Sequence, residues 1–168
     1  MSALSNLDDI DKRILLARDQ APGAPSVELA RIAGLSRNTV QSRLKRLERG
    51  EAVGAPSQRI RPSALGHPVL AFLTIELVQG RPRSITDSLK EIPEVLDVYA
   101  VSGDGDLLAR VVARDNSHLY RVTQRVLRAP GVVRTRSMIS VMELVPTRIG
   151  PLLRASLEEG DEQDSSGS

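Results

Sequence analysis

Apolar residues in the first fifty positions recur at steps of three and four, which is the spacing of amphipathic helices. Four such residues lie between Leu7 and Leu15, with three aspartates in what would be the first turn, where the helix dipole favours carboxylates. This pattern predicts a helix that ends before Pro22. A second, shorter helix is predicted to begin with Ser26 as its N-cap and to end at Gly34.

A third helix is predicted from Arg37 to about Arg49, with Ser36 as its N-cap. Its apolar positions Val40, Leu44 and Leu47 fall on one side, which fixes that side to a core and leaves the other side free. The free side presents, against the single acid Glu48, the residues Arg37, Asn38, Gln41, Ser42, Arg43, Lys45, Arg46 and Arg49.

The spacing of Ala30, Gly34 and Val40 is typical of a helix-turn-helix. The small Ala30 side chain allows the third helix to approach, Gly34 can adopt a positive φ in the turn, and Val40 fills the gap between the helices. We therefore expect the third helix to be a recognition helix. Residues 51–60 are predicted to form a two-stranded wing, in which Arg59 is placed to touch the backbone of a duplex.

The side chains on the free side of the third helix suit a DNA duplex. Long donors near the start of a recognition helix reach base edges in the major groove, and cations beside them reach phosphates. A basic face that is merely solvated, or a helix-turn-helix used only to bind protein, is the alternative. The expected DNA-binding residues are Arg37, Asn38, Gln41 and Arg43 for bases, Lys45, Arg46 and Arg49 for phosphates, and Ser36, Thr39, Ser42 and Arg59 beside them.

Strand-like and helix-like patterns alternate beyond a stretch rich in Pro and Gly at residues 54–68. The order βαββαβ is the ferredoxin-like arrangement. Apolar residues on both faces of these strands exceed what one helical layer can bury, so we expect the second face to meet a second copy of the chain. The expected elements are strands at 69–78, 95–102, 107–113 and 132–144, a helix from about Ile85 that ends at Pro93, and a helix capped by Asp115 or Asn116.

These elements predict an α+β protein with an N-terminal winged helix-turn-helix and a C-terminal ferredoxin-like βαββαβ domain. The expected boundaries are 1–53 for the first domain, 54–68 for the wing and linker, 69–146 for the second domain, and 147–168 for a C-terminal extension. Residues 158–168 contain five acidic side chains, no basic one and no apolar one, which predicts a disordered tail. Such a tail would either keep the protein soluble or act as an autoinhibitory mimic of a polyanion.

Composition excludes several classes of function. The 168 residues include three aromatics, two histidines and no cysteine, which argues against base-stacking single-strand binders, disulfide frameworks and thiolate metal sites. Lys and Arg number 23 against 21 Asp and Glu, so the body of the chain is basic once the acidic tail is set aside. With no apolar run of about 20 residues and no signal-peptide core, we expect a cytoplasmic protein without a membrane partner.

A helix-turn-helix of this spacing, joined to βαββαβ with a glycine-acidic turn, resembles the Lrp/AsnC or feast/famine family of prokaryotic transcription regulators. The resemblance covers about residues 6–145. It implies a sequence-specific double-stranded DNA-binding regulator whose dimers assemble further, commonly to octamers, and respond to an amino acid or related metabolite. The motifs that carry it are Leu7-Asp8-Asp9-Ile10-Asp11, Leu35-Ser36-Arg37-Asn38-Thr39-Val40, Arg43-Leu44-Lys45-Arg46-Leu47-Glu48, Pro62-Ser63-Ala64-Leu65-Gly66 and Ser102-Gly103-Asp104-Gly105-Asp106-Leu107-Leu108.

The resemblance also implies where the effector binds. Backbone amides freed by glycines can receive a carboxylate, and an Asp can receive an ammonium group, although the same residues form a good plain hairpin turn. The family usually has a larger side chain where Gly105 stands, and a Gly-Tyr pair where this chain has Ala55-Pro56. The implied effector residues are Ser102, Gly103, Asp104, Gly105 and Asp106 in the turn, with Thr135 and Ser137 on the last strand.

Two other functions stay open at this stage. A ligand-independent protein that organises DNA would keep the recognition helix, and some tetrapyrrole decarboxylases resemble the same fold. For such an enzyme the chain offers two imidazole groups, those of its two histidines. His67 is expected to be a linker residue, and His118 is expected to be solvated or to cap a helix. No nucleophile–base set, Gly-rich phosphate loop or paired metal ligands occur in the sequence. We therefore expect no catalytic residues, no metal and no cofactor other than the effector.

Overall fold

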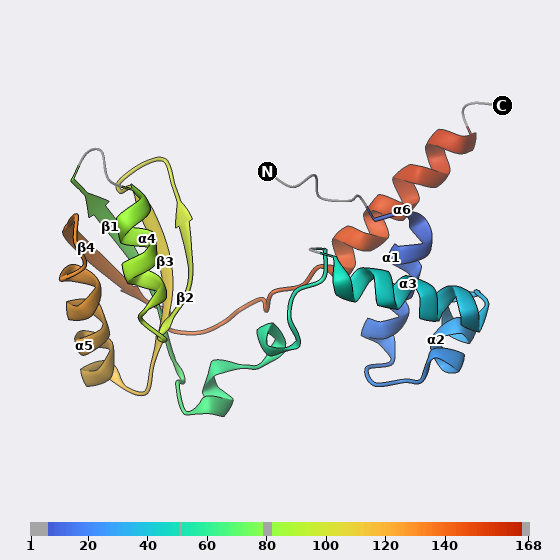
Figure 1. Cartoon of the computed structure of the whole chain (residues 1–168), viewed down its shortest axis with the longest axis horizontal. Coiled ribbons are helices and arrows are strands. Elements are labelled where there is room, and N and C mark those ends of the chain that lie inside the picture. The colour runs from blue at the N-terminus through green and yellow to red at the C-terminus, as the bar shows by residue number, and fades with distance from the viewer. Residues whose placement is uncertain (1–6, 51, 79–81, 166–168) are drawn as a thin grey trace. The chain divides into compact units, whose positions relative to one another are not determined.

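The computed structural model describes residues 7–50, 52–78 and 82–165, and it divides the chain into two compact units. The first unit combines Met1–Gln58 with Val145–Ser168, and the second is Arg59–Leu144. The blue-to-red course of the chain in Figure 1 follows this path out of the first unit, through the second and back. Two separate segments of the backbone therefore connect the units.

A helix-turn-helix forms the core of the first unit. Val40 has no exposed surface and Ala30 is 6% exposed, as expected for residues that lie between packed helices. Gly34 ends the second helix in the left-handed conformation, with φ at 67°. The predicted helix-turn-helix is thus confirmed. Its helices are α1 (Asp9–Gln20), α2 (Ser26–Ala33) and α3 (Arg37–Arg49), and the apolar cluster at its centre is Ile14, Ala17, Leu29, Ala30 and Val40.

Side chains cap two of these helices. The Asp8 carboxylate accepts the Asp11 N–H at 2.9 Å, and the Asp11 carboxylate accepts the Asp8 N–H at 3.3 Å, which makes a capping box at the start of α1. Ser36 caps α3, as predicted, by accepting the Thr39 N–H at 3.1 Å. The prediction that Ser26 caps α2 is wrong, because Pro25 with its restricted φ occupies the cap position and Ser26 begins the helix.

The C-terminal extension is helical, so the prediction of disorder from residue 158 onward is wrong as far as Ser165. Helix α6 (Gly150–Ser165) packs against α1, and Lys12 Nζ donates to Ser156 O at 3.1 Å. Leu153 and Leu157 are less exposed than most of their neighbours. Because these apolar residues precede the acidic segment, they anchor a helix that then propagates through it.

The two strands predicted for the wing are absent between residues 52 and 60, and Glu51 lies outside the described residues. Two short 3₁₀ helices take their place, η1 (Pro56–Arg59) and η2 (Pro62–Leu65). Each begins at a proline. Because proline cannot donate to a strand ladder and has a φ that suits the first position of a helix, these residues favour helical turns over strands.

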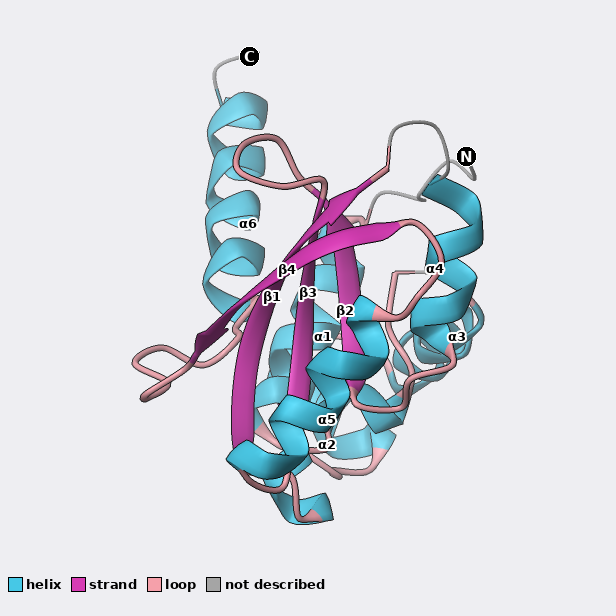
Figure 2. Cartoon of the chain, turned by 90° about the vertical axis from the view of Figure 1, so that its left-hand side faces the viewer, coloured by secondary structure: helices cyan, strands magenta, loops and turns pink. Residues whose placement is uncertain are grey.

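The second unit is a four-stranded antiparallel sheet with two helices on one face, visible in Figure 2. The strand order is β2-β3-β1-β4, which confirms the predicted ferredoxin-like arrangement. The last strand ends five residues earlier than predicted. The elements are β1 (Val69–Leu77), α4 (Pro82–Lys90), β2 (Val95–Ala100), β3 (Leu107–Ala113), α5 (Asn116–Leu127) and β4 (Val132–Ile139).

Alternation along β1 separates the two faces of this sheet. Leu73 and Ile75 are completely buried in the core formed with α4 and α5, whereas Phe72 and Thr74 lie on the open face. The open face is more polar than predicted, because charged residues of every strand alternate onto it. By their register these charged residues are Glu76 of β1, Asp97 of β2, Arg110 of β3, and Arg134 and Arg136 of β4.

A charged cluster holds the start of α5 near the start of β2. His118 Nδ1 accepts the Arg114 N–H at 3.2 Å, so its proton is on Nε2, which lies 3.2 Å from Glu94 Oε1. Partial burial acts to raise the pKa of Glu94, but its backbone N–H, Arg125 and His118 together hold that pKa below its usual value. His118 is 7% exposed, so of the two expectations the solvated histidine is wrong, whereas its acceptance of the Arg114 N–H just before the N-cap Asp115 agrees with a capping role. Its role is structural.

Candidate nucleic-acid interface and ligand site

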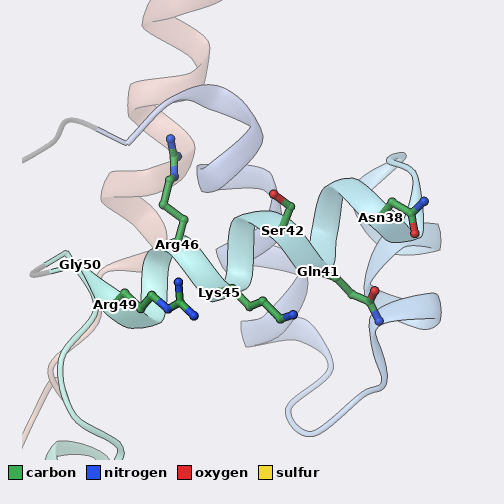
Figure 3. A pocket seen from close by; sticks show the side chains of 7 residues that line it. All are labelled: Asn38, Gln41, Ser42, Lys45, Arg46, Arg49 and Gly50. Atoms are coloured by element: carbon green, nitrogen blue, oxygen red, sulfur yellow. The ribbon is translucent and has the colours of Figure 1, made fainter.

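The side of α3 that faces away from the core is an exposed polar and basic surface. Val40 and Leu47, at 0% and 4% exposure, anchor the opposite side. Figure 3 shows Gln41, Lys45 and Arg49 in one row along the helix, four residues apart. This surface contains a shallow, open depression of 690 Å³, lined by Asn38, Gln41, Ser42, Lys45, Arg46, Arg49 and Gly50.

Arg43 and Arg46 are paired with carboxylates of α1. Arg43 contacts Asp8 and, at 3.3 Å, the Oδ1 atom of Asp11. Arg46 contacts Oδ2 of Asp11, and in Figure 3 its side chain points away from that of Lys45. Asp11 has no exposed surface, and a buried carboxylate requires counter-ions. These two arginines therefore already have a structural role.

The pairing of Asp8 with Arg43 shifts the pKa of each group in the direction that favours its charged form. Loss of solvent acts to raise the pKa of Asp8, but hydrogen bonds from Arg43 and from the Asp11 N–H bring that pKa below its ordinary value. The hydrogen bond to Asp8 in turn raises the pKa of Arg43. Both partners are thus ionised at neutral pH.

The remaining residues of the predicted DNA-binding set differ in how free they are. Arg37 and Asn38 are exposed in the first turn of α3. Ser36 Oγ and Thr39 Oγ1 lie 2.8 Å apart, so both hydroxyls belong to the helix cap. Arg59 is exposed at the end of η1 and begins the second unit.

A second open depression, of 490 Å³, lies beside the turn between β2 and β3. Four of the five predicted turn residues line it, and Ser102 does not. Sequence reasoning missed two further lining residues, Glu76 and Arg136. The complete lining is Glu76, Gly103, Asp104, Gly105, Asp106 and Arg136.

Backbone contacts fasten this turn to the end of β1. The Asp106 N–H donates to Ile75 O at 3.0 Å, and the Asp106 carboxylate accepts the Leu77 N–H at 2.7 Å. Gly105 lies so close to β1 that a Cβ at this position would overlap Thr74 Cγ2. A larger residue at this position would therefore require the Thr74 side chain to move. Asp104 is exposed at the rim.

The register of β4 decides which of its residues reach the depression. Thr135 and Ser137 lie opposite Ile75 and Leu73, which face the helices. Arg136 alternates onto the open face and lines the depression. The two strand residues that the resemblance implied as effector contacts therefore do not line it, and the arginine between them does.

The described residues contain neither a cluster of three or more metal-ligating side chains nor a helix long and apolar enough to span a bilayer.

Comparison with known proteins identifies both halves of the chain. Residues 7–53 match the winged helix-turn-helix DNA-binding family, and residues 70–149 match the Lrp/AsnC ligand binding domain. The chain is 41% identical over 135 residues to the HTH-type transcriptional regulator LrpA of Mycobacterium tuberculosis, covering 79% of this chain and 89% of the relative. It is 31% identical over 133 residues to the regulator FL11 of Pyrococcus furiosus, covering 79% and 88%.

Solved structures agree with this relationship. The feast or famine regulatory protein Rv3291c of M. tuberculosis, complexed with L-methionine, matches with a TM-score of 0.75 at 35% identity and covers 85% of this chain and 97% of that one. The regulator NMB0573 of Neisseria meningitidis, also complexed with L-methionine, has a TM-score of 0.75 at 24% identity and shows the shared fold. Because both family models match and relatives at 31% and 41% identity cover most of its length, the chain belongs to the Lrp/AsnC family of DNA-binding transcriptional regulators and carries the ligand-binding domain of that family.

Proposed function

We propose that the row formed by Gln41, Lys45 and Arg49 faces the major groove of a DNA duplex, with Arg37 and Asn38 at its leading end. The observation that carries this proposal is the burial of the opposite side of α3, which leaves the row free and basic. Arginine, asparagine and glutamine can bond base edges, and Lys45 and Arg49 suit phosphates. Arg43 and Arg46 already pair with Asp8 and Asp11, so we propose that they contribute less to DNA binding than Lys45 and Arg49 do.

Titration of a labelled duplex over a range of salt concentrations tests this contact. Cations that neutralise phosphates release counter-ions from DNA, so the logarithm of the binding constant falls linearly with the logarithm of the salt concentration, by about 0.9 for each phosphate contacted. We expect a steep dependence. A complex that is insensitive to salt would contradict the proposal.

We propose further that the depression beside the β2–β3 turn binds the effector, an α-amino acid. The Arg136 guanidinium can hold the α-carboxylate by paired hydrogen bonds, and Asp104 and Glu76 can receive the α-ammonium group. All three residues line the same depression, so opposite charges are available for a zwitterion. The L-methionine complex of the relative Rv3291c supports methionine as the first ligand to test.

Replacing Arg136 with Ala is expected to abolish the stabilisation of the protein by its amino acid. At 100 times its dissociation constant, an effector adds about 2.7 kcal/mol to the free energy of unfolding, and the variant lacks the group that holds the carboxylate. Thermal melting with L-methionine, and then with the other amino acids, measures this effect. Arg121→Ala is the matched control, because Arg121 is an exposed arginine of α5 that does not line the depression.

Two results would contradict the effector proposal. If no amino acid changes the melting temperature of the wild-type protein, the depression does not bind an amino acid. An equal response in Arg136→Ala and in wild type would show that the amino acid binds elsewhere.

We also propose that the chain forms a homodimer through the open face of its sheet and assembles further, to an oligomer such as an octamer. Tyr99 and Met138 support this proposal, since they are 57% and 51% exposed on or beside that face. A two-fold dimer would present two copies of α3 to neighbouring turns of the major groove. In this reading residues 1–53 bind DNA, 54–68 link, 69–146 sense the ligand and oligomerise, and the protein acts in the cytoplasm.

A further inference from the structure

Two aspartates at the start of α1 and two arginines of α3 form a single charged cluster. Asp8 accepts the Asp11 N–H through one carboxylate oxygen and pairs with Arg43 through the other. Asp11 accepts the Asp8 N–H at 3.3 Å and pairs with both Arg43 and Arg46. The same carboxylates therefore cap one helix and bind cations of the helix that we propose reads DNA.

Exposure separates the roles of the two carboxylates. The Asp11 side chain has no exposed surface, so its charge depends on its partners. The Asp8 side chain is 47% exposed, and Arg43 beside it is 25% exposed. Solvent can replace Arg43 as the partner of Asp8, and the fold therefore does not require the charge of Asp8. The Asp8–Arg43 pair nevertheless occupies a cation of the recognition helix.

We propose that Asp8 and Asp11 set how many cations α3 offers to DNA, because they pair with Arg43 and Arg46. The inference rests on the proposed DNA contact of α3. A guanidinium that stays engaged with a carboxylate neutralises no phosphate and releases no counter-ion from the duplex. Asp8 is then a residue that determines DNA affinity without touching DNA, and Asp11 is a positioning residue.

Asp8→Asn is the variant that tests this inference. Asparagine is as good an N-cap as aspartate, so the start of α1 is kept while one of the two charges that hold Arg43 is removed, and Arg43 is left with its 3.3 Å contact to Asp11. We expect tighter binding to duplex DNA at low salt and a salt dependence steeper by up to about 0.9 for each recognition helix on the DNA. The advantage over wild type therefore shrinks by up to about three- to fourfold for each helix between roughly 50 and 200 mM salt. Asp8→Ser, which also keeps a capping side chain, is expected to behave in the same way.

Asp9→Asn is the matched control. It removes the same charge one residue along, but Asp9 pairs with Lys12 at 3.0 Å and not with α3. A general gain of positive charge would change both variants equally, whereas release of Arg43 changes only the Asp8 variants. Thermal melting of each variant shows that it is folded under the binding conditions.

The possible results separate this inference from the proposal on which it rests. A steeper slope in Asp8→Asn, with the wild-type slope in Asp9→Asn, supports it. A wild-type slope in Asp8→Asn, weaker binding by that variant, or equal changes in both variants overturns this inference alone. A wild-type chain whose affinity for DNA does not change with salt overturns the contact between α3 and DNA, and the inference with it.

Discussion

Replacing Arg43 and Arg46 together with Ala is expected to lower the free energy of unfolding of the first unit by about 3–5 kcal/mol, the cost of leaving a buried charge without its partners. Asp11 has no exposed surface, and among the residues that the structure describes it keeps the Asp8 N–H as its partner in this variant. Because the chain has two compact units, a signal from the whole protein would mix two transitions. Hydrogen exchange resolved to peptides of α1 and α3 reports on the first unit alone.

Two further variants show whether the buried charge is the cause. Lys45→Ala with Arg49→Ala removes the same two charges from the same helix, and we expect it to change stability by less than about 0.5 kcal/mol because both side chains are exposed. Adding Asp11→Asn to the Arg43/Arg46 double variant removes the unpaired charge and is expected to restore part of the lost stability. Equal destabilisation by the two double variants would contradict the structural role of Arg43 and Arg46.

The Lys45→Ala, Arg49→Ala variant is expected to have the largest effect on DNA binding. Each lost phosphate contact removes one release of counter-ions, so two contacts reduce affinity about 30-fold at 0.15 M salt for each recognition helix on the DNA. The loss should be similar for a preferred and a scrambled duplex, because phosphate contacts carry no sequence information. Fluorescence anisotropy with both duplexes measures it, together with a salt slope that becomes shallower by about 1.8 for each helix.

Arg13→Ala with Arg154→Ala is the matched control for this experiment. Both arginines are exposed and belong to the first unit, on α1 and α6, so their removal changes the charge of the unit equally without altering α3. We expect it to bind DNA nearly as well as wild type. A loss confined to one of the two duplexes, or an equal loss in the control, would show that Lys45 and Arg49 do not contact phosphates.

Periodicity predicted the helices and the sheet because both patterns are local in the sequence. The spacing of Val40, Leu44 and Leu47 defines the buried side of α3 without knowledge of any partner. The pairing of Arg43 and Arg46 was not predictable in this way, because their partners lie 32 to 35 residues earlier on α1. The sequence of one helix shows which of its residues are cationic, but it does not show which of them pair with carboxylates elsewhere in the fold.

The candidate ligand site was predicted in part. The glycine-acidic turn is a local motif, and four of its five residues line the depression. Arg136 was missed because the face to which a strand residue points depends on register, and a shift of one residue exchanges it with Thr135 and Ser137.

Helix α6 was also missed. The apolar residues that anchor it precede the acidic segment from which disorder was predicted.

Photo-crosslinking from single positions to duplex DNA tests the central claim, that the exposed side of α3 lies against the duplex, most directly. A photoreactive amino acid at Ser42, on that side of α3, is expected to crosslink to the bases of a duplex selected from random-sequence DNA. The same group at Ala155, which is exposed on α6 of the same unit, is expected to give no crosslink. Crosslinking from Ala155 together with none from Ser42 would contradict the claim.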